Sequence, residues 1–179
     1  KVKANPVPEK VISLSYPEAV VNGVSMTLAV LFDKLIKLVA VSNFHAIVTG
    51  SAGWGKSQLA KYLARLLHAA NVTTVISEDN FAMATTIDLI RQRLTDGLPL
   101  FWIVEDAHKI PTPDLTALLN FMSGATSPDN LSTMVLYNPD ECDAERKKLL
   151  ENALERPGRA TIKIQTTLLA EQRAAELKD

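Results

Sequence analysis

Cysteine is almost absent from this sequence. Cys142 is the only one among 179 residues, so no disulfide can form within the chain. A protein without disulfides is typical of a reducing compartment, and we expect a cytoplasmic location, including that of a cytoplasmic domain of a membrane-associated protein. We interpret Cys142 itself as a buried or incidental thiol.

The chain also lacks a charge excess of either sign and a long unbroken apolar run. Its net charge is −1, so there is no global positive charge for gripping nucleic acid, although a local patch is compatible with this value. The longest apolar stretch, residues 24–41, is interrupted by Asp33, Lys34 and Lys37, which indicates a helix of a globular domain rather than a membrane span. No signal peptide is visible. Because the sequence starts at Lys1 rather than Met, we expect a fragment or a processed chain.

What remains is the composition of an ordinary globular domain. Hydrophobic residues make up 47% and charged residues 22%, which argues against a disordered chain. A length of 179 residues suits one domain with a single core. Residues 1–16 contain two prolines and little periodicity, so we interpret them as an extended lead-in and residues 17–179 as the domain.

Strand-like runs alternate with helical periodicity along this domain. Short apolar or β-rich runs predict five strands, at residues 44–49, 72–76, 98–104, 131–137 and 160–165. Apolar residues at helical spacing predict helices at residues 26–42 (capped by Ser25), 56–70, 80–95, 113–122 (capped by Thr112), 140–154 and 168–177. This alternation is typical of parallel strands joined by right-handed crossovers. We therefore expect an α/β fold, a three-layer sandwich with a five-stranded parallel sheet.

A glycine-rich motif follows the first predicted strand. It matches the pattern G-x-x-x-x-G-K-[ST] in full, with Gly50, Ser51, Ala52, Gly53, Trp54, Gly55, Lys56 and Ser57. Glycines let main-chain amides converge on an anion, and the amino end of the following helix adds further N–H groups. We predict a site for the phosphates of ATP, ADP or a guanine nucleotide, which extends to Gln58. Lys56 would bridge the β- and γ-phosphates, and Ser57 would bind Mg²⁺.

Trp54 occupies a variable position of this motif. It is open to two interpretations: it shields the phosphates or contacts a partner, or it is an aromatic spacer without a special role.

Two carboxylates follow the almost wholly apolar run 98–104, a strand that we expect beside the phosphate-loop strand. Glu105 is predicted to hold the water shell of Mg²⁺, and Asp106 to orient the attacking water as a general base. The usual order of aspartate and glutamate is reversed here, and a misplacement of about 1 Å can cost on the order of 100-fold in rate. We therefore predict slow or partner-dependent hydrolysis. The alternative is that the pair only caps the next loop. For His108 we expect packing or hydrogen bonding rather than chemistry.

Three further polar residues lie near predicted strand ends. Asn138 follows the fourth strand and is a candidate sensor of the γ-phosphate, or else it starts a turn with Pro139 and Asp140. Arg156 and Arg159 precede the fifth strand, where an arginine could reach a neighbouring subunit's site and stabilise charge during phosphoryl transfer. The alternative for each arginine is an ordinary surface residue.

With these residues in place, the chain resembles the AAA+ ATPases. The motif order is the same: an entry helix, Walker A at residues 50–57, Walker B at 103–106, Asn138, and arginines before the last strand. Within that group it looks most like the bacterial ExeA-type ATPases of secretion-system assembly and relatives that aid transposition, through the helix at 26–41, the run 105–108 and the ending at 162–172. The resemblance implies ATP with Mg²⁺, self-association into a ring, and a small helical lid that is absent or truncated here.

The leading hypothesis is an ATPase that drives assembly or remodelling of a larger, secretion-type complex of protein partners. A second is a nucleotide-gated protein-binding module with little or no hydrolysis, which the reversed acidic pair favours. A third is a small-molecule kinase that clamps phosphates with Arg146, Lys147 and Lys148. The last is an ATPase helper of DNA transposition, which the near-neutral charge disfavours.

Overall fold

The computed structural model describes residues 19–51, 56–78, 81–123, 127–155 and 161–166. The strands are β1 (Ala19–Val21), β2 (Val24–Met26), β3 (His45–Thr49), β4 (Thr73–Ser77), β5 (Leu100–Val104), β6 (Leu131–Tyr137) and β7 (Thr161–Thr166). The helices are α2 (Leu28–Val41), α3 (Lys56–Ala69), α4 (Met83–Leu94), α5 (Thr112–Ser123) and α6 (Ala144–Glu155), with 3₁₀ turns η1 (Ala107–Lys109) and η2 (Pro139–Glu141).

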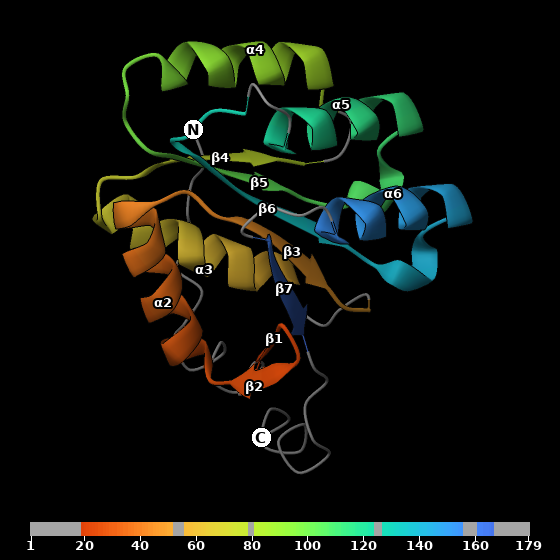
Figure 1. Ribbon diagram of the computed structural model, residues 1–179, viewed down its shortest axis with the longest axis horizontal. Helices are drawn as coiled ribbons and strands as arrows, with labels where there is room; N and C mark the ends of the chain where they lie inside the picture. The colour runs from red at the N-terminus through yellow and green to blue at the C-terminus, as the bar shows by residue number, and fades with distance from the viewer. Residues whose placement is uncertain (1–18, 52–55, 79–80, 124–126, 156–160, 167–179) are drawn as a thin grey trace, which may run out of the picture.

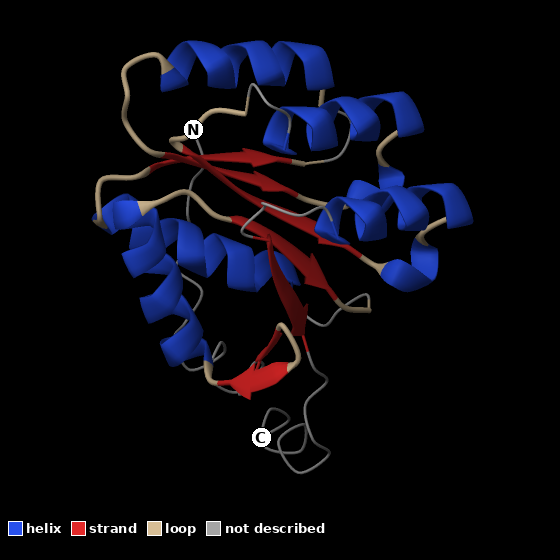
Figure 2. Cartoon of the chain, viewed as in Figure 1, coloured by secondary structure: helices blue, strands red, loops and turns tan. Residues whose placement is uncertain are grey.

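These elements form three layers, as the sequence predicts. Helices α2 and α3 cover one face of the sheet, and α4, α5 and α6 cover the other (Figure 1). Figure 2 shows the strands enclosed between the two helical layers. The α/β sandwich expected from the alternating pattern is thereby confirmed.

The sheet contains the predicted parallel strands and two more. Its order is β2-β1-β7-β3-β6-β5-β4. The five strands from β7 to β4 run parallel, which confirms that part of the prediction. Strand β1 pairs antiparallel with both β2 and β7, so the described residues contain a seven-stranded sheet rather than one of five.

The additional strands form a hairpin that the sequence analysis missed. Asn22 and Gly23 connect β1 to β2 with φ of 49° and 83°, the left-handed backbone that a two-residue hairpin turn requires. The Asn22 side chain accepts the Lys163 amide at 3.0 Å, which ties the turn to β7. The expected cap at Ser25 is wrong, because Ser25 lies in β2. Thr27 caps α2 instead, and its hydroxyl accepts the Val30 amide at 3.4 Å.

Most remaining boundaries agree with the sequence to within a few residues. Helix α5 begins at Thr112 itself rather than after it, since the Leu115 amide bonds to the Pro111 carbonyl at 2.9 Å. The predicted helix at 140–154 starts later, at Ala144, because η2 occupies its first turn. The lead-in at 1–16 and the helix at 168–177 lie outside the described residues. Within the described ranges, no helix combines the length and apolarity needed to cross a membrane.

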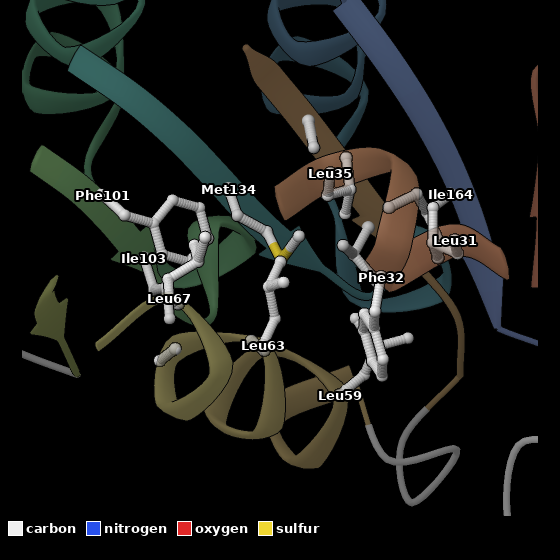
Figure 3. Packing of buried hydrophobic residues seen from close by; sticks show 14 of the residues in the cluster. Leu31, Phe32, Leu35, Leu59, Leu63, Leu67, Phe101, Ile103, Met134 and Ile164 are labelled. Carbon is white, nitrogen blue, oxygen red and sulfur yellow. The ribbon is translucent and has the colours of Figure 1, made fainter. Parts of the chain in front are cut away.

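Apolar side chains fill both faces of the sheet. Every residue of β5 is at most 3% exposed, as expected for a strand covered on two sides. Its alternate side chains enter opposite cores: Phe101 and Ile103 pack on the α2 and α3 side, and Trp102 on the other. Figure 3 shows Phe101 and Ile103 directed toward Leu67 of α3. This two-sided burial fixes the position of the β5 carboxyl end, where the acidic pair begins.

Candidate functional site

The parallel strands bring the predicted site residues to one edge of the sheet. Strands β3, β5 and β6 are followed at their carboxyl ends by Gly50, Glu105 and Asn138. This is the edge at which open α/β sheets bind ligands. One expectation is wrong: β6 lies between β3 and β5, so the acidic pair is not on the neighbour of the phosphate-loop strand. Two strand spacings, about 10 Å, separate them.

Gly50 is required by a neighbouring strand. A Cβ added to Gly50 would overlap the hydroxyl oxygen of Thr166 in β7. That hydroxyl is buried and donates to the Thr49 carbonyl at 3.3 Å, so it is held in place. Gly50 does not have a positive φ. A glycine is therefore needed here for space rather than for its backbone conformation. The first position of the motif thus has a packing role in addition to its predicted role in phosphate binding.

Lys56 bridges the described ends of the phosphate loop. Its ammonium donates to the carbonyls of Gly50 at 2.7 Å and Ser51 at 3.0 Å. Burial lowers the pKa of Lys56, while the carboxylates of Asp106 and Glu141 act in the opposite direction. Asp106 of the acidic pair is therefore within electrostatic reach of the lysine, although β6 lies between β3 and β5.

The other predicted loop residues are described only in part. Ser57 is half-buried and Gln58 is exposed in the first turn of α3. Ser51 is half-buried, and its hydroxyl donates to the Asp140 carboxylate at 3.0 Å. Four predicted binding residues lie outside the described residues: Ala52, Gly53, Trp54 and Gly55.

The two acidic residues differ in environment. Glu105 is 9% exposed, and its Oε1 is buried without a hydrogen-bond partner among the described residues. Asp106 has a left-handed backbone, with φ 50° and ψ 47°, and its carboxylate lies 3.4 Å from the Lys109 ammonium. Within the described part of the chain, the Asp106 side chain makes no capping bond to η1, so the capping alternative gains no support.

Both acids line a cavity of about 220 Å³ between the ends of β4 and β5. Glu78 follows β4 and Asp114 lies in α5, so four carboxylates and Lys109 share the cavity wall. Sequence analysis did not identify Glu78 or Asp114, because their approach depends on the crossovers rather than on any local motif.

Asn138 and His108 connect the ends of β5 and β6. The buried Asn138 accepts the Asp140 amide at 3.1 Å through Oδ1 and so begins η2, as its turn interpretation predicts. His108 is 7% exposed, and its Nδ1 accepts the Asn138 amide at 3.2 Å. The packing and hydrogen-bonding role expected for His108 is confirmed. The sensor role of Asn138 stays a prediction, and Asp140 is a contact of the phosphate loop that the sequence did not indicate.

Some of the remaining candidate residues lie within the described part of the chain and others do not. Arg146, proposed for a kinase-like clamp, donates to the Ile110 carbonyl at 2.7 Å and pairs with Asp143 at the start of α6. Its guanidinium is thus engaged within the chain, which disfavours the kinase hypothesis. Burial raises the pKa of the half-buried Cys142 thiol, which agrees with an incidental thiol. Arg156 and Arg159 lie outside the described residues.

The donor chemistry at this edge suits a hard cation. No three His, Cys, Asp or Glu side chains converge into a metal site anywhere in the described ranges. Mg²⁺ is commonly held by only one or two carboxylates together with a hydroxyl, water and phosphate oxygens. The unpartnered Glu105 oxygen and the Ser57 hydroxyl are donors of this kind.

Comparison with known proteins bears on the fold. No family model matches the sequence, and no curated protein matches it. Among solved structures, Caenorhabditis elegans PCH-2 is 15% identical, with 84% of this chain and 44% of that chain covered and a TM-score of 0.59. Saccharomyces cerevisiae RIF2 is 15% identical, with 82% and 58% covered and a TM-score of 0.56. The Thermotoga maritima RuvB Holliday junction branch migration motor is 13% identical, with 85% and 50% covered and a TM-score of 0.52.

The chain spans about half the length of these proteins. The likeness shows the fold alone, an α/β sandwich with a mostly parallel sheet flanked by helices. At this level of identity the activity is a separate question, because one fold serves many functions.

Proposed function

We propose that this chain binds ATP, or ADP, with Mg²⁺ at the edge formed by residues 50–57 and 105–106. The observation that carries the proposal is the setting of Lys56. Its ammonium is partly buried at the amino end of α3, the positive end of the helix dipole, where a cation is unfavourable on its own. A bound phosphate group would make this arrangement favourable, because the phosphate is attracted both by the helix end and by the ammonium.

Ser57 and Glu105 are the residues that would hold Mg²⁺. The buried Glu105 oxygen without a partner has the unmet acceptor capacity that a cation or its water shell would satisfy. Bound Mg²⁺ supplies charge neutralisation for the phosphates. Glu105 would hold the ion from the carboxyl end of β5. The Asp106 carboxylate, at the same edge of the sheet, favours the charged form of Lys56 and so opposes the lowering of its pKa by burial.

For hydrolysis, Asp106 is the proposed general base that accepts the proton of the attacking water. Asn138 is the proposed γ-phosphate sensor, and Arg156 and Arg159 are proposed to act across a subunit interface. The reversed order of Glu105 and Asp106 shifts each carboxylate by one methylene, so turnover is slow or depends on a partner.

A second candidate is a nucleotide-gated protein-binding module without turnover. The reversed acidic pair favours it, because a misplaced base removes hydrolysis while Lys56 and Ser57 still permit binding. In this case the bound nucleotide orders a surface for a protein partner, and release rather than chemistry resets it.

The biological setting that we propose is assembly or remodelling of a larger complex by a ring of such chains in the cytoplasm. The resemblance to ExeA-type ATPases supports a secretion-type complex. One structural neighbour is a Holliday junction branch migration motor, which supports a role on DNA, as in transposition. The net charge of −1 counts against strong DNA affinity, so we favour protein partners.

Calorimetry with Mg-ATP and Mg-GTP tests the binding proposal. The unmodified chain should bind one or both, and Lys56→Ala should weaken binding by at least about tenfold, since it removes a charge-assisted contact. Lys61→Ala is the matched control, because Lys61 lies in the same helix and contacts Glu78 at 3.9 Å. Heat no greater than that of Lys56→Ala, for both nucleotides, would refute nucleotide binding.

Turnover assays separate the ATPase from the gate. The double variant Glu105→Asp, Asp106→Glu restores the usual order of the pair and should raise kcat by about tenfold or more if misplacement limits hydrolysis. No turnover by either protein at any concentration, with binding intact, would leave only the gate.

A further inference from the structure

The two ring nitrogens of His108 contact the two ends of η2, namely its N-cap Asn138 and its last residue Glu141. Its Nδ1 accepts the amide of Asn138, so this nitrogen carries a lone pair and the ring proton resides on Nε2. Nε2 lies 2.9 Å from the Glu141 carboxylate, a close polar contact that is not aligned as a hydrogen bond. The buried imidazole therefore fixes the start and the end of η2 relative to the β5 carboxyl end.

The η2 segment in turn contacts the phosphate loop. The Asp140 amide donates to Asn138 Oδ1 at 3.1 Å, and the Asp140 carboxylate accepts the Ser51 hydroxyl at 3.0 Å. The Ser51 carbonyl accepts the Lys56 ammonium at 3.0 Å. A continuous set of hydrogen bonds thus runs from His108, two residues beyond the acidic pair, to the predicted phosphate-binding lysine.

We propose that His108 is a positioning residue that holds the Asp140 carboxylate against the phosphate loop and thereby weakens the binding of phosphates there. This inference rests on the proposed nucleotide binding and names a residue that controls it. A negative carboxylate bonded to the second loop residue repels a polyphosphate through the Coulomb interaction. When His108 no longer holds η2, the exposed Asp140 side chain leaves Ser51 and points into solvent, where water and salt screen it.

The test compares two replacements of His108, each of which places an amide near one of the two ring nitrogens. In His108→Asn, the side-chain oxygen occupies the place of Nδ1 and can accept the Asn138 amide. In His108→Gln, an amide reaches the place of Nε2, and the acceptor at the δ position is lost. Both variants lose the ring, and His108→Asn, which is shorter by one methylene, leaves the larger cavity at this buried site. Affinities for Mg-ATP and for inorganic triphosphate are measured by calorimetry in each variant, alone and combined with Asp140→Asn.

We expect Asp140→Asn to raise both affinities about three- to tenfold, because the charge is removed and the Ser51 contact is kept. His108→Gln should raise them in the same direction, His108→Asn should match the unmodified chain, and His108→Gln should add nothing to Asp140→Asn. Exchange of the Asn138, Asp140 and Glu141 amides, measured without nucleotide, should accelerate in His108→Gln only.

Equal effects of the two His108 variants, or additivity with Asp140→Asn, would overturn the positioning role. If His108→Gln fails to fold, Asp140→Asn and Ser51→Ala decide the matter, and an unchanged affinity in both overturns the proposal. Binding by the unmodified chain with no coupling rejects this inference alone, whereas absence of any binding rejects the proposed function with it.

Discussion

The contact between Gly50 and Thr166 makes a quantitative prediction about the phosphate loop. In Gly50→Ala, the new methyl group overlaps the hydroxyl of Thr166. This residue is 3% exposed, and its hydroxyl donates to the Thr49 carbonyl. Overpacking of this kind costs about 1–3 kcal/mol. Alanine also lowers the conformational entropy of the unfolded chain, which stabilises the protein by about 0.4–1 kcal/mol. This gain applies here because the backbone of Gly50 is not left-handed. We expect a net loss of about 1–2 kcal/mol, or a Tm lower by about 2–8 °C for a domain of this size.

The assay is urea unfolding followed by circular dichroism, repeated in a Thr166→Ala background. Removal of the Thr166 hydroxyl makes room for the methyl group, so the cost of Gly50→Ala should fall below about 0.5 kcal/mol there. Gly97→Ala is the control, since Gly97 has φ of 72° with open space around it. Its cost of about 1 kcal/mol comes from the backbone and should be the same in both backgrounds. Equal costs of Gly50→Ala in the two backgrounds would refute the steric explanation.

Three further predictions concern stability. Thr27→Ala should cost about 0.5–1 kcal/mol in thermal unfolding, because it removes the cap of α2, whereas Ser25→Ala in β2 should change less than about 0.5 kcal/mol. Burial raises the pKa of Tyr137 to about 12, so its stabilising effect is complete below its unfolded pKa of 10.0 and is lost as the pH rises to about 12; Tyr137→Phe should remove that slope from a pH series. Glu105→Gln should raise the free energy of unfolding by about 1 kcal/mol at pH 7, since it replaces a buried unpartnered carboxylate, and an unchanged value in denaturant titration would contradict this.

The parallel core was predictable because β5 is a continuous apolar run and the other parallel strands are short β-rich runs. In β5 and β6, every residue is buried, and no other element explains seven successive buried positions such as Leu131–Tyr137. The hairpin was also visible in principle. Asn22-Gly23 between valines is a strong hairpin signal, but the helical periodicity beginning at Met26 drew the boundary too early.

The order of the strands and the contacts across it were not predictable from local patterns. The connection from β3 to β4 skips two positions of the sheet, which β6 and β5 fill, and periodicity carries no record of that choice. The Ser51–Asp140 bond joins residues 89 positions apart. Such contacts bring the charged groups of the site together, and only the structure shows them.

Three departures from ordinary local preference meet at the carboxyl edge of the sheet. Lys56 places a partly buried cation at a helix amino end, Glu105 buries an acceptor without a partner among the described residues, and Asp106 adopts a left-handed backbone. A single substitution could remove any one of them, and substitutions that stabilise a protein are commonly found. One ligand would satisfy the two charged groups together: a polyanion answers the ammonium and the helix end, and its divalent counter-ion answers the carboxylate. That economy of explanation favours a magnesium nucleotide over separate structural reasons for each residue.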